Sequence, residues 1–228
     1  MCVKKIAFEL ELFGTAKNWK RYWAKTIRRH VSGSVVEVGA GLGTIAADLM
    51  NRDVDRLILL EPDPDLFSKL SKTEFPKQVG CKSGVLRDLN ETFDTIIYVD
   101  VLEHIEFDLE ETMAAYERMN KGAHLVILVP ALQFLYSPFD QAVGHYRRYS
   151  RTSLRSAVDP RLETVSETYL DSIGLLASIA NKLLLRSSSP TRRQIDMWDR
   201  MMIRVSTVID PLLLYSVGKT VVGVYRKP

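Results

Sequence analysis

The chain has few cysteines and no long apolar run. Cys2 and Cys81 are the only cysteines among 228 residues, so no disulfide framework is predicted and a reducing compartment fits. The first residues do not read as a signal peptide, because Glu9 and Glu11 interrupt the apolar run. No stretch approaches the roughly 20 uninterrupted apolar residues that a membrane-spanning helix needs. We therefore expect a cytoplasmic protein.

The chain also lacks a strong excess of charge of either sign. It has 31 basic and 28 acidic residues, a net charge of +3, which does not suggest a protein that coats nucleic acid. The balance is uneven along the chain, however. Residues 17–30 hold six Lys or Arg and no acid, whereas residues 103–111 hold five acids and no Lys or Arg. Local patches therefore carry more information than the net charge.

Apolar runs rich in β-branched residues alternate with helical patterns over the first 130 residues. The runs predict strands at 34–40, 56–62, 93–100 and 123–131, with a weaker strand within 77–89. Helical spacing lies between them, at 44–52, 63–75 and 107–121, the last of these closed by Gly122. This alternation predicts an α/β fold, a doubly wound, Rossmann-like parallel sheet with helices on both faces.

The last third of the chain has a different pattern. Residues 162–170 and 219–227 read as strands, and 171–216 as helical apart from breaks at 186–193 and at Asp210–Pro211. We expect one domain, with a basic helical segment at 1–33, the core at 34–170, a helical insertion at 171–216 and the last strand at 217–228. No metal-ligand set is predicted.

A glycine-rich turn follows the first strand. Gly39, Gly41 and Gly43 stand where backbone amides and a helix N-terminus can approach a ligand. A dinucleotide fingerprint read from Gly41 also succeeds, with Ala46 in its last place, so a nicotinamide enzyme stays open. Glu37 favours a cationic ligand over a pyrophosphate.

The second strand ends in LLEPD, which places Glu61 beyond the glycine turn. A carboxylate at the end of that strand can accept hydrogen bonds from both hydroxyls of a ribose. The alternative is that Glu61 only caps the following helix. Next to the glycine turn, ribose binding is the favoured interpretation.

With these pieces in place, the chain resembles the class I S-adenosylmethionine-dependent methyltransferases. The resemblance rests on EVGAGLG, LLEPD, GVLRDL and FDTIIYVDVLEHIE, and it covers essentially the whole chain. It implies a seven-stranded, mostly parallel sheet with an antiparallel last strand. It also implies S-adenosylmethionine as the cofactor, with S-adenosylhomocysteine as the product. One departure is Asn120-Lys121-Gly122-Ala123, where the family usually has Lys-Pro-Gly-Gly.

The same resemblance assigns parts of the cofactor to residues of this sequence. The glycines would line the methionine moiety, Glu37 would contact its amino end and Glu61 would bind the ribose. The strand-three end would border the adenine, and the strand-four end would form the floor near the methyl group. The residues implied are Glu37, Gly39, Ala40, Gly41, Gly43, Glu61, Pro62, Leu86, Arg87, Asp88, Asp100, Val101 and Leu102.

Histidines at two predicted strand ends are candidates for the catalytic chemistry. A general base assists methyl transfer to a hydroxyl, and histidine has a suitable pKa. His104 follows the fourth strand and His145 follows the fifth, at the edge where open α/β sheets bind ligands. We expect His145 to act as base or hydroxyl partner, with Asp140 to orient it or to take the base role. For His104, a packed residue that orients the loop is an equal alternative.

Aromatic and basic residues surround His145. Tyr146, Arg147, Arg148 and Tyr149 are the predicted acceptor-binding residues, with at least one of the two arginines facing the active site. The stretch VPALQFLYSPFDQAVGHYRRYSRTSL resembles a methyltransferase subfamily associated with bacterial surface-polysaccharide and glycolipid modification. That resemblance implies a small-molecule, glycan or glycolipid acceptor and favours O-methylation.

Other functions remain open at this stage. One is methylation of RNA or another macromolecule, since the basic segment at 16–30 carries interleaved aromatic residues. We instead expect that segment to be a lid, with Arg21, Tyr22 or Trp23 near the cofactor, and no nucleic-acid partner. A second is a non-catalytic partner subunit. The insertion at 171–216 is expected to be a substrate lid, a homodimer face or a peripheral contact with the inner face of the membrane.

Overall fold

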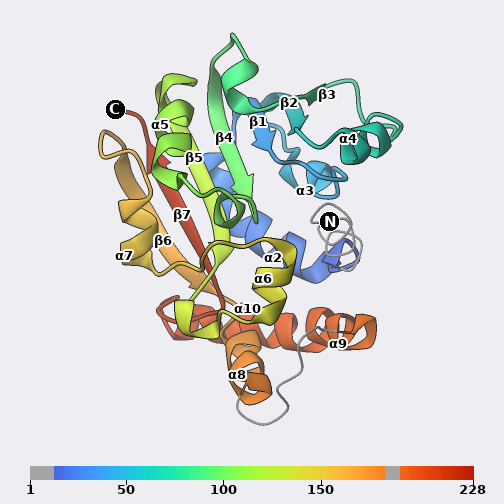
Figure 1. The fold of residues 1–228 in the computed structure, drawn as a ribbon, viewed down its shortest axis with the longest axis vertical. Coiled ribbons are helices and arrows are strands. Elements are labelled where there is room, and N and C mark those ends of the chain that lie inside the picture. The colour runs from blue at the N-terminus through green and yellow to red at the C-terminus, as the bar shows by residue number, and fades with distance from the viewer. Residues whose placement is uncertain (1–12, 183–190) are drawn as a thin grey trace.

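The protein folds around a single seven-stranded sheet (Figure 1). The computed structural model describes residues 13–182 and 191–228. The strand order is β3-β2-β1-β4-β5-β7-β6, and β7 runs antiparallel to both of its neighbours. The strands are β1 Gly33–Val38, β2 Val54–Glu61, β3 Val79–Ser83, β4 Phe93–Val99, β5 Met119–Pro130, β6 Glu163–Leu170 and β7 Thr220–Arg226. The predicted fold class, with its antiparallel last strand, is confirmed.

Helices cover both faces of the sheet. One core cluster joins β-strand residues to α2 (Lys17–Ile27), α3 (Ala46–Leu49), α4 (Pro64–Leu70) and the C-terminal helices. The other cluster joins the opposite strand face to α5 (Asp108–Glu117) and α7 (Arg151–Ser156). The central strands are therefore buried on both sides, which explains their near-continuous apolar sequences.

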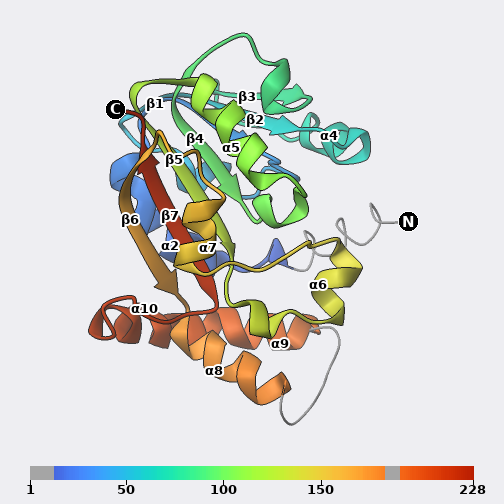
Figure 2. The same cartoon turned by 60° about the vertical axis from the view of Figure 1, so that its left-hand side comes forward.

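The carboxyl ends of the parallel strands meet at one edge of the sheet. Figures 1 and 2 show α6 (Pro138–Val143) and the C-terminal helices gathered below this edge. The C-terminal helices are α8 (Ser172–Ala180), α9 (Arg192–Met197), a π-helical turn at Trp198–Met202, and α10 (Ile203–Leu212). This edge carries the predicted site.

Some element boundaries differ from those predicted. Helix α5 ends at Glu117 and β5 begins at Met119, whereas the sequence placed the helix as far as residue 121. Met119 is buried in the core and pairs with Phe93, so tertiary contacts favour strand over helix at this point. Helix α3 is also shorter than predicted, because Met50 has an extended backbone that ends it.

The helical insertion is confirmed where it is described. The predicted break at 186–193 falls mostly outside the described residues, and α9 begins at Arg192. The predicted break at Asp210–Pro211 is wrong, because α10 continues through Pro211 to Leu212. A proline in the last turn removes one helical hydrogen bond near the helix end, which the helix tolerates.

Buried aspartates join α2 to this insertion. Asp199 accepts hydrogen bonds from the backbone of Asn18 and Trp19, which satisfies donors at the N-terminus of α2. Asp210 accepts the Tyr22 hydroxyl at 2.8 Å. Helix α2 is thereby fixed to the C-terminal helices at both of these positions.

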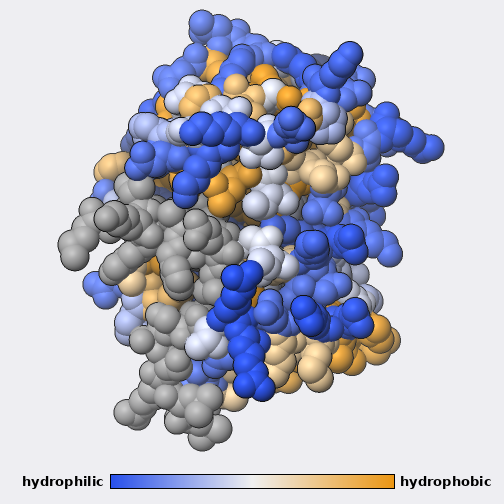
Figure 3. Space-filling model, turned by 90° about the vertical axis from the view of Figure 1, so that its right-hand side faces the viewer, coloured by the Kyte–Doolittle hydropathy of each residue, from blue (hydrophilic) through white to orange (hydrophobic). Residues whose placement is uncertain are grey.

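The outer face of the insertion carries exposed apolar side chains. Met197, Met201, Val205, Val208 and Leu212 are each at least partly exposed at helical spacing. Figure 3 shows apolar side chains along the lower edge of one face, at the end where these helices lie. Among the residues that the structure describes, no helix has the length and apolar character required to cross a membrane.

Candidate active site

The glycine turn after β1 adopts a backbone that only glycine accommodates easily. Gly39, Gly41 and Gly43 have φ values of 69°, 58° and 67°. A Cβ atom on Gly39 would lie 2.6 Å from Cγ2 of Val101, two residues beyond the end of β4. The turn therefore brings two strand ends into close contact, as a site for a bound ligand requires.

Glu61 holds the glycine turn against the end of β2. Its Oε2 accepts a hydrogen bond from the amide of Gly41 at 2.7 Å, and its Oε1 accepts one from the amide of Asp63 at 2.8 Å. Burial raises the pKa of Glu61, although these amide donors oppose the shift. Glu61 therefore lies at the turn, and its carboxylate retains further acceptor capacity.

Glu37 is a buried carboxyl group beside the turn. Its Oε2 has no hydrogen-bond partner among the described residues, and burial together with the nearby Glu61 raises the pKa of Glu37 to about 8. The positive charge of Lys20 opposes this shift and lowers the pKa of Glu37. A buried carboxyl group with an open acceptor atom fits a ligand that brings a positive charge.

The residues of α2 lie differently from the prediction. Arg21, Tyr22 or Trp23 was expected near the cofactor; Tyr22 and Trp23 are buried in the core, and Arg21 is exposed. Lys20 is the residue of this helix whose charge acts on Glu37, and its Nζ donates to the carbonyl of Gly14. The aromatic residues face the core because they lie on the side of α2 that covers the sheet.

The other predicted cofactor residues lie at the same edge, but not all are accessible. Ala40 donates to the carbonyl of Leu60, and Asp100 has a left-handed backbone, with φ of 53°. Leu86, predicted to border the adenine, has a fully buried side chain. Gly43 packs close to Leu70 and Phe75. Of the remaining predicted residues, Leu102 is buried, and three are exposed: Pro62, Arg87 and Asp88.

His145 and Asp140 form a hydrogen-bonded pair. His145 Nδ1 lies 3.0 Å from Asp140 Oδ1, and Arg148 Nε donates to the same oxygen at 2.8 Å. Burial raises the pKa of Asp140, but hydrogen bonds from His145, Arg148 and Ser137 outweigh it and hold the pKa well below its usual range. An ionised Asp140 favours the tautomer of His145 that keeps its proton on Nδ1, which leaves the Nε2 lone pair available. His145 Nε2 is buried and has no hydrogen-bond partner in residues 13–182 and 191–228.

His104 lies against His145. Their ring centroids are 4.6 Å apart, with an angle of 82° between the planes. Burial and the neighbouring His145 lower the pKa of His104 to about 4, so its ring is neutral at physiological pH. Glu103, which the prediction did not include, is fully buried, and its Oε1 lies 4.0 Å from His145 Nε2.

The predicted acceptor-binding residues divide into two kinds. Tyr149 is buried, with 1% of its surface exposed, and its hydroxyl donates to Asp108 at 2.9 Å. Arg147 is also occupied, because it pairs with Asp108 at 2.6 Å and donates to the Glu106 carbonyl. Arg148 faces His145 through Asp140, as expected of one of the two arginines. Tyr146 is 51% exposed.

Lys219 is a further charged residue at this edge that the sequence did not single out. Its Nζ lies 3.7 Å from Asp171 and 4.1 Å from the centre of the Trp198 ring. Burial lowers its pKa. Asp100 is partly open to solvent, but desolvation of its carboxyl group raises the pKa to about 6. The positive charges of His145, Lys219 and Arg148 oppose this shift and lower the pKa. The charges of His145 and Lys219 thus both act on the residue that follows β4.

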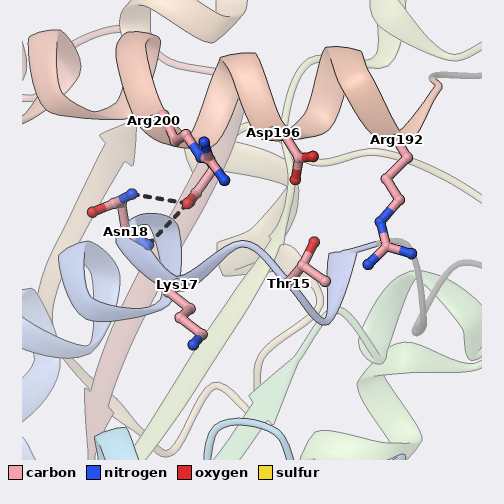
Figure 4. A pocket seen from close by; sticks show the side chains of 7 residues that line it. Thr15, Lys17, Asn18, Arg192, Asp196 and Arg200 are labelled. Atoms are coloured by element: carbon pink, nitrogen blue, oxygen red, sulfur yellow. Dashed lines mark hydrogen bonds between the residues drawn. The ribbon is translucent and has the colours of Figure 1, made fainter.

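A separate hollow of about 360 Å³ lies between α2 and α9. Figure 4 shows the amide and backbone nitrogens of Asn18 directed at Asp199, with Lys17, Arg192 and Arg200 around the same space. None of the predicted site residues lines it. The hollow is therefore distinct from the edge that carries the glycine turn.

Comparison with known families decides the assignment. A family model described as a methyltransferase domain matches residues 14–161, well over half of the chain. The chain belongs to this methyltransferase family. The search of curated proteins gave no sequence match.

Solved structures of methyltransferases share the fold. A Haloferax volcanii protein solved with the Trm112 methyltransferase activator has a TM-score of 0.66 at 15% identity, over 99% of this chain and 94% of its own. A geranyl diphosphate methyltransferase solved with S-adenosylmethionine has a TM-score of 0.62 at 11% identity, over 91% and 85%. NodS, an N-methyltransferase from Bradyrhizobium japonicum solved with S-adenosylhomocysteine, has a TM-score of 0.55 at 12% identity, over 94% and 88%.

The residues at the glycine turn of this methyltransferase fit the chemistry of S-adenosylmethionine. The open acceptor atom of Glu37 suits the positively charged methionine end, and the Gly39 turn leaves no room for a side chain beside Val101. Glu61 stands at the β2 end, where a ribose would bind. Together with the family assignment, this confirms S-adenosylmethionine as the cofactor rather than a nicotinamide nucleotide.

Proposed function

We propose that this methyltransferase transfers the methyl group of S-adenosylmethionine to a hydroxyl group of a small-molecule or glycan acceptor. The observation that carries the proposal is the buried pair of His145 and Asp140. The charge of His145 acts on Asp100, the residue that follows β4, and the pair lies at the same sheet edge as the glycine turn. A base at that position supports removal of a proton from an acceptor hydroxyl.

The donor side of the site binds and orients. S-adenosylmethionine supplies a methyl group that is already activated as part of a sulfonium. The protein therefore has to align the groups and exclude water. Glu61 would hold the ribose, and Glu37 would pair with the cationic methionine end. The glycine turn would let backbone amides approach.

On the acceptor side of the site, His145 would accept the proton of the acceptor hydroxyl. Asp140 fixes the orientation and tautomer of the His145 ring, so that Nε2 can accept the proton of the acceptor hydroxyl. Arg148 in turn fixes Asp140 through two hydrogen bonds, at 2.8 and 3.1 Å. The imidazolium that forms is stabilised by the ionised Asp140.

The acceptor class rests on two further arguments. The stretch around Gly144-His145-Tyr146 resembles a subfamily associated with surface polysaccharides and glycolipids, which favours a sugar hydroxyl. Exposed Tyr146 and the partly buried Lys219 could contact a sugar ring and an anionic group on it. Geranyl diphosphate, named with one structural neighbour, is likewise a small molecule.

An RNA acceptor is less well supported. The aromatic residues that would stack on bases are Trp19, Tyr22 and Trp23, and all three are buried in the core. A partner protein is a stronger second candidate, because the Haloferax volcanii neighbour was solved with an activator. The exposed apolar side chains of α10 are Val205, Val208 and Leu212. A partner protein, a membrane surface or a second copy of the chain could cover them.

The test uses S-adenosylmethionine labelled in its methyl group. The full chain is incubated with nucleotide sugars, lipid-linked sugars, small hydroxylated metabolites and total RNA. The proposal predicts label in a sugar or small-molecule fraction as an alkali-stable ether. Label in RNA alone, or none in any fraction although S-adenosylhomocysteine binds, would overturn it.

A further inference from the structure

The residues after β4 and those after α6 meet at one point inside the site. Glu103 and His104 lie on a short helical turn directly after the β4 end, and His145 follows the C-terminus of α6. One ligand atom from each of these three residues lies within 4.8 Å of the other two. We propose that Glu103, His104 and His145 bind a divalent transition-metal ion, with zinc as the best-suited ion.

The chemical set matches a known preference of such ions. Two imidazoles and one carboxylate bind zinc in catalytic sites and leave further positions open for water or substrate. The ligands must be deprotonated, and a neutral imidazole ring offers one nitrogen lone pair to the ion. The buried carboxylate of Glu103 would supply negative charge.

The orientation of His145 points to a ligand. Its side chain is only 6% exposed, and its Nε2 has no hydrogen-bond partner. That atom lies 4.0 Å from Glu103 Oε1, too far for a hydrogen bond and open enough for an ion between the two. Two ligand atoms at tetrahedral zinc lie about 3.4 Å apart. Side-chain rotations that move the ligand atoms by about an ångström would therefore bring all three to zinc-binding distance.

Both imidazoles already have the outer partners that metal-bound histidines require. His145 Nδ1 is hydrogen-bonded to Asp140, whose carboxylate Arg148 holds in place. A ring nitrogen of His104 donates to the backbone of Gly144. Such carboxylate and carbonyl partners fix the ring orientation and tautomer of metal ligands.

This inference goes beyond the proposed function, and it changes the role of His145, because Nε2 cannot hold the ion and accept a proton at the same time. Metal binding by these residues does not depend on methyl transfer. With an ion bound, Nε2 of His145 would be a ligand rather than the base, and the ion would face the acceptor side beside Asp100.

The test measures metal binding directly. The full chain is stripped with a chelator, then titrated with Zn²⁺ by calorimetry and with Co²⁺ by visible absorption. The expected result is one ion per chain and a Co²⁺ spectrum typical of mixed nitrogen and oxygen ligands. Glu103→Gln and His104→Gln should each weaken binding by at least 100-fold. Asp140→Asn should weaken it by roughly 10- to 100-fold, as loss of an outer partner does.

Matched variants exclude adventitious binding. His30 and His124 form another histidine pair, with ring centroids 5.1 Å apart and outside the site, so His124→Gln should leave Zn²⁺ affinity unchanged. Cys81→Ser removes the free thiol of β3 in the same way. Affinity for S-adenosylhomocysteine reports whether each variant is folded. Absence of binding at 100 µM Zn²⁺, or equal affinity in folded Glu103→Gln and His104→Gln, would overturn the metal site and leave the proposed methyl transfer standing.

Discussion

His145 and Asp140 are joined by a hydrogen bond of 3.0 Å between Nδ1 and Oδ1, and the Nε2 atom of the same ring has no hydrogen-bond partner. The two residues lie within six positions of one another, on either side of the C-terminus of α6. This pair connects a short local segment to the edge of the sheet where the cofactor binds.

Removal of the Asp140 carboxylate should affect turnover more than cofactor binding. In Asp140→Asn the aspartate charge is lost, the His145 ring is no longer held in one tautomer, and turnover should fall by about 10²- to 10⁴-fold. Affinity for S-adenosylhomocysteine should change by less than threefold. Steady-state kinetics and calorimetry measure the two quantities. An equal loss of cofactor affinity would show that Asp140 supports the whole site rather than His145.

The cofactor turn should not tolerate a side chain at Gly39. In Gly39→Ala the new Cβ would clash with Val101 and the backbone would be strained, so S-adenosylhomocysteine binding should fall by more than 100-fold. Gly80→Ala is the matched control, because a Cβ there meets nothing within 4 Å and should leave binding unchanged. Binding by Gly39→Ala at wild-type affinity would contradict the turn geometry.

Cofactor binding should release a proton from Glu37. The pKa of about 8 leaves this carboxyl group mostly protonated at pH 7, and a positively charged ligand favours the ionised form. Affinity for S-adenosylmethionine should therefore rise with pH until about 8 and then level. Calorimetry in buffers of different ionisation enthalpy counts the protons released.

Glu37→Gln provides the control for this linkage. The variant should release no proton and should bind S-adenosylmethionine roughly 10- to 100-fold more weakly above pH 8. Because the pKa of Glu37 is raised on folding, its contribution to the free energy of unfolding falls as the pH rises from 4.5 through about 8. The ligand-free variant should then be more stable than the wild type at pH 9. Unchanged proton release would assign the linkage to another group.

Asp210 should be important for stability. Its carboxylate accepts from the backbone amides of Asp171 and Ser172 and from the Tyr22 hydroxyl, all in the core. Asp210→Asn should lower the free energy of unfolding by about 3 kcal/mol, and Tyr22→Phe by about 1.5 kcal/mol. Urea unfolding measures both changes. Asp55→Asn, at an exposed position of β2, should change stability by less than about 0.5 kcal/mol.

The fold could be predicted because its signals are local. Apolar runs that end in glycines or acids indicated β1, β2 and β4. The same strand-turn pattern, read along the sequence, also identified Glu37, the glycines and Glu61. The α5–β5 boundary could not, because Met119 is a strand residue through its burial and its pairing with Phe93.

The acceptor side of the site was less accessible to prediction. Tyr146 and Tyr149 lie three positions apart, yet the structure exposes one and buries the other. Tyr149 pairs with Ala131 across an isolated bridge, which turns its side chain into the core. Glu103 adjoined a predicted residue, but only the fold brings it to His145, 42 positions along the chain. Lys219 had no distinguishing pattern in the sequence.

The central claim is that His145 acts on the acceptor while the glycine turn and its acids bind the cofactor. The most direct test measures S-adenosylhomocysteine affinity and label transfer from S-adenosylmethionine in the wild type and in His145→Ala, with the acceptor found by the screen above. The account predicts wild-type affinity in the variant, with turnover reduced to about 1% or less. Turnover by His145→Ala at the wild-type rate would contradict it.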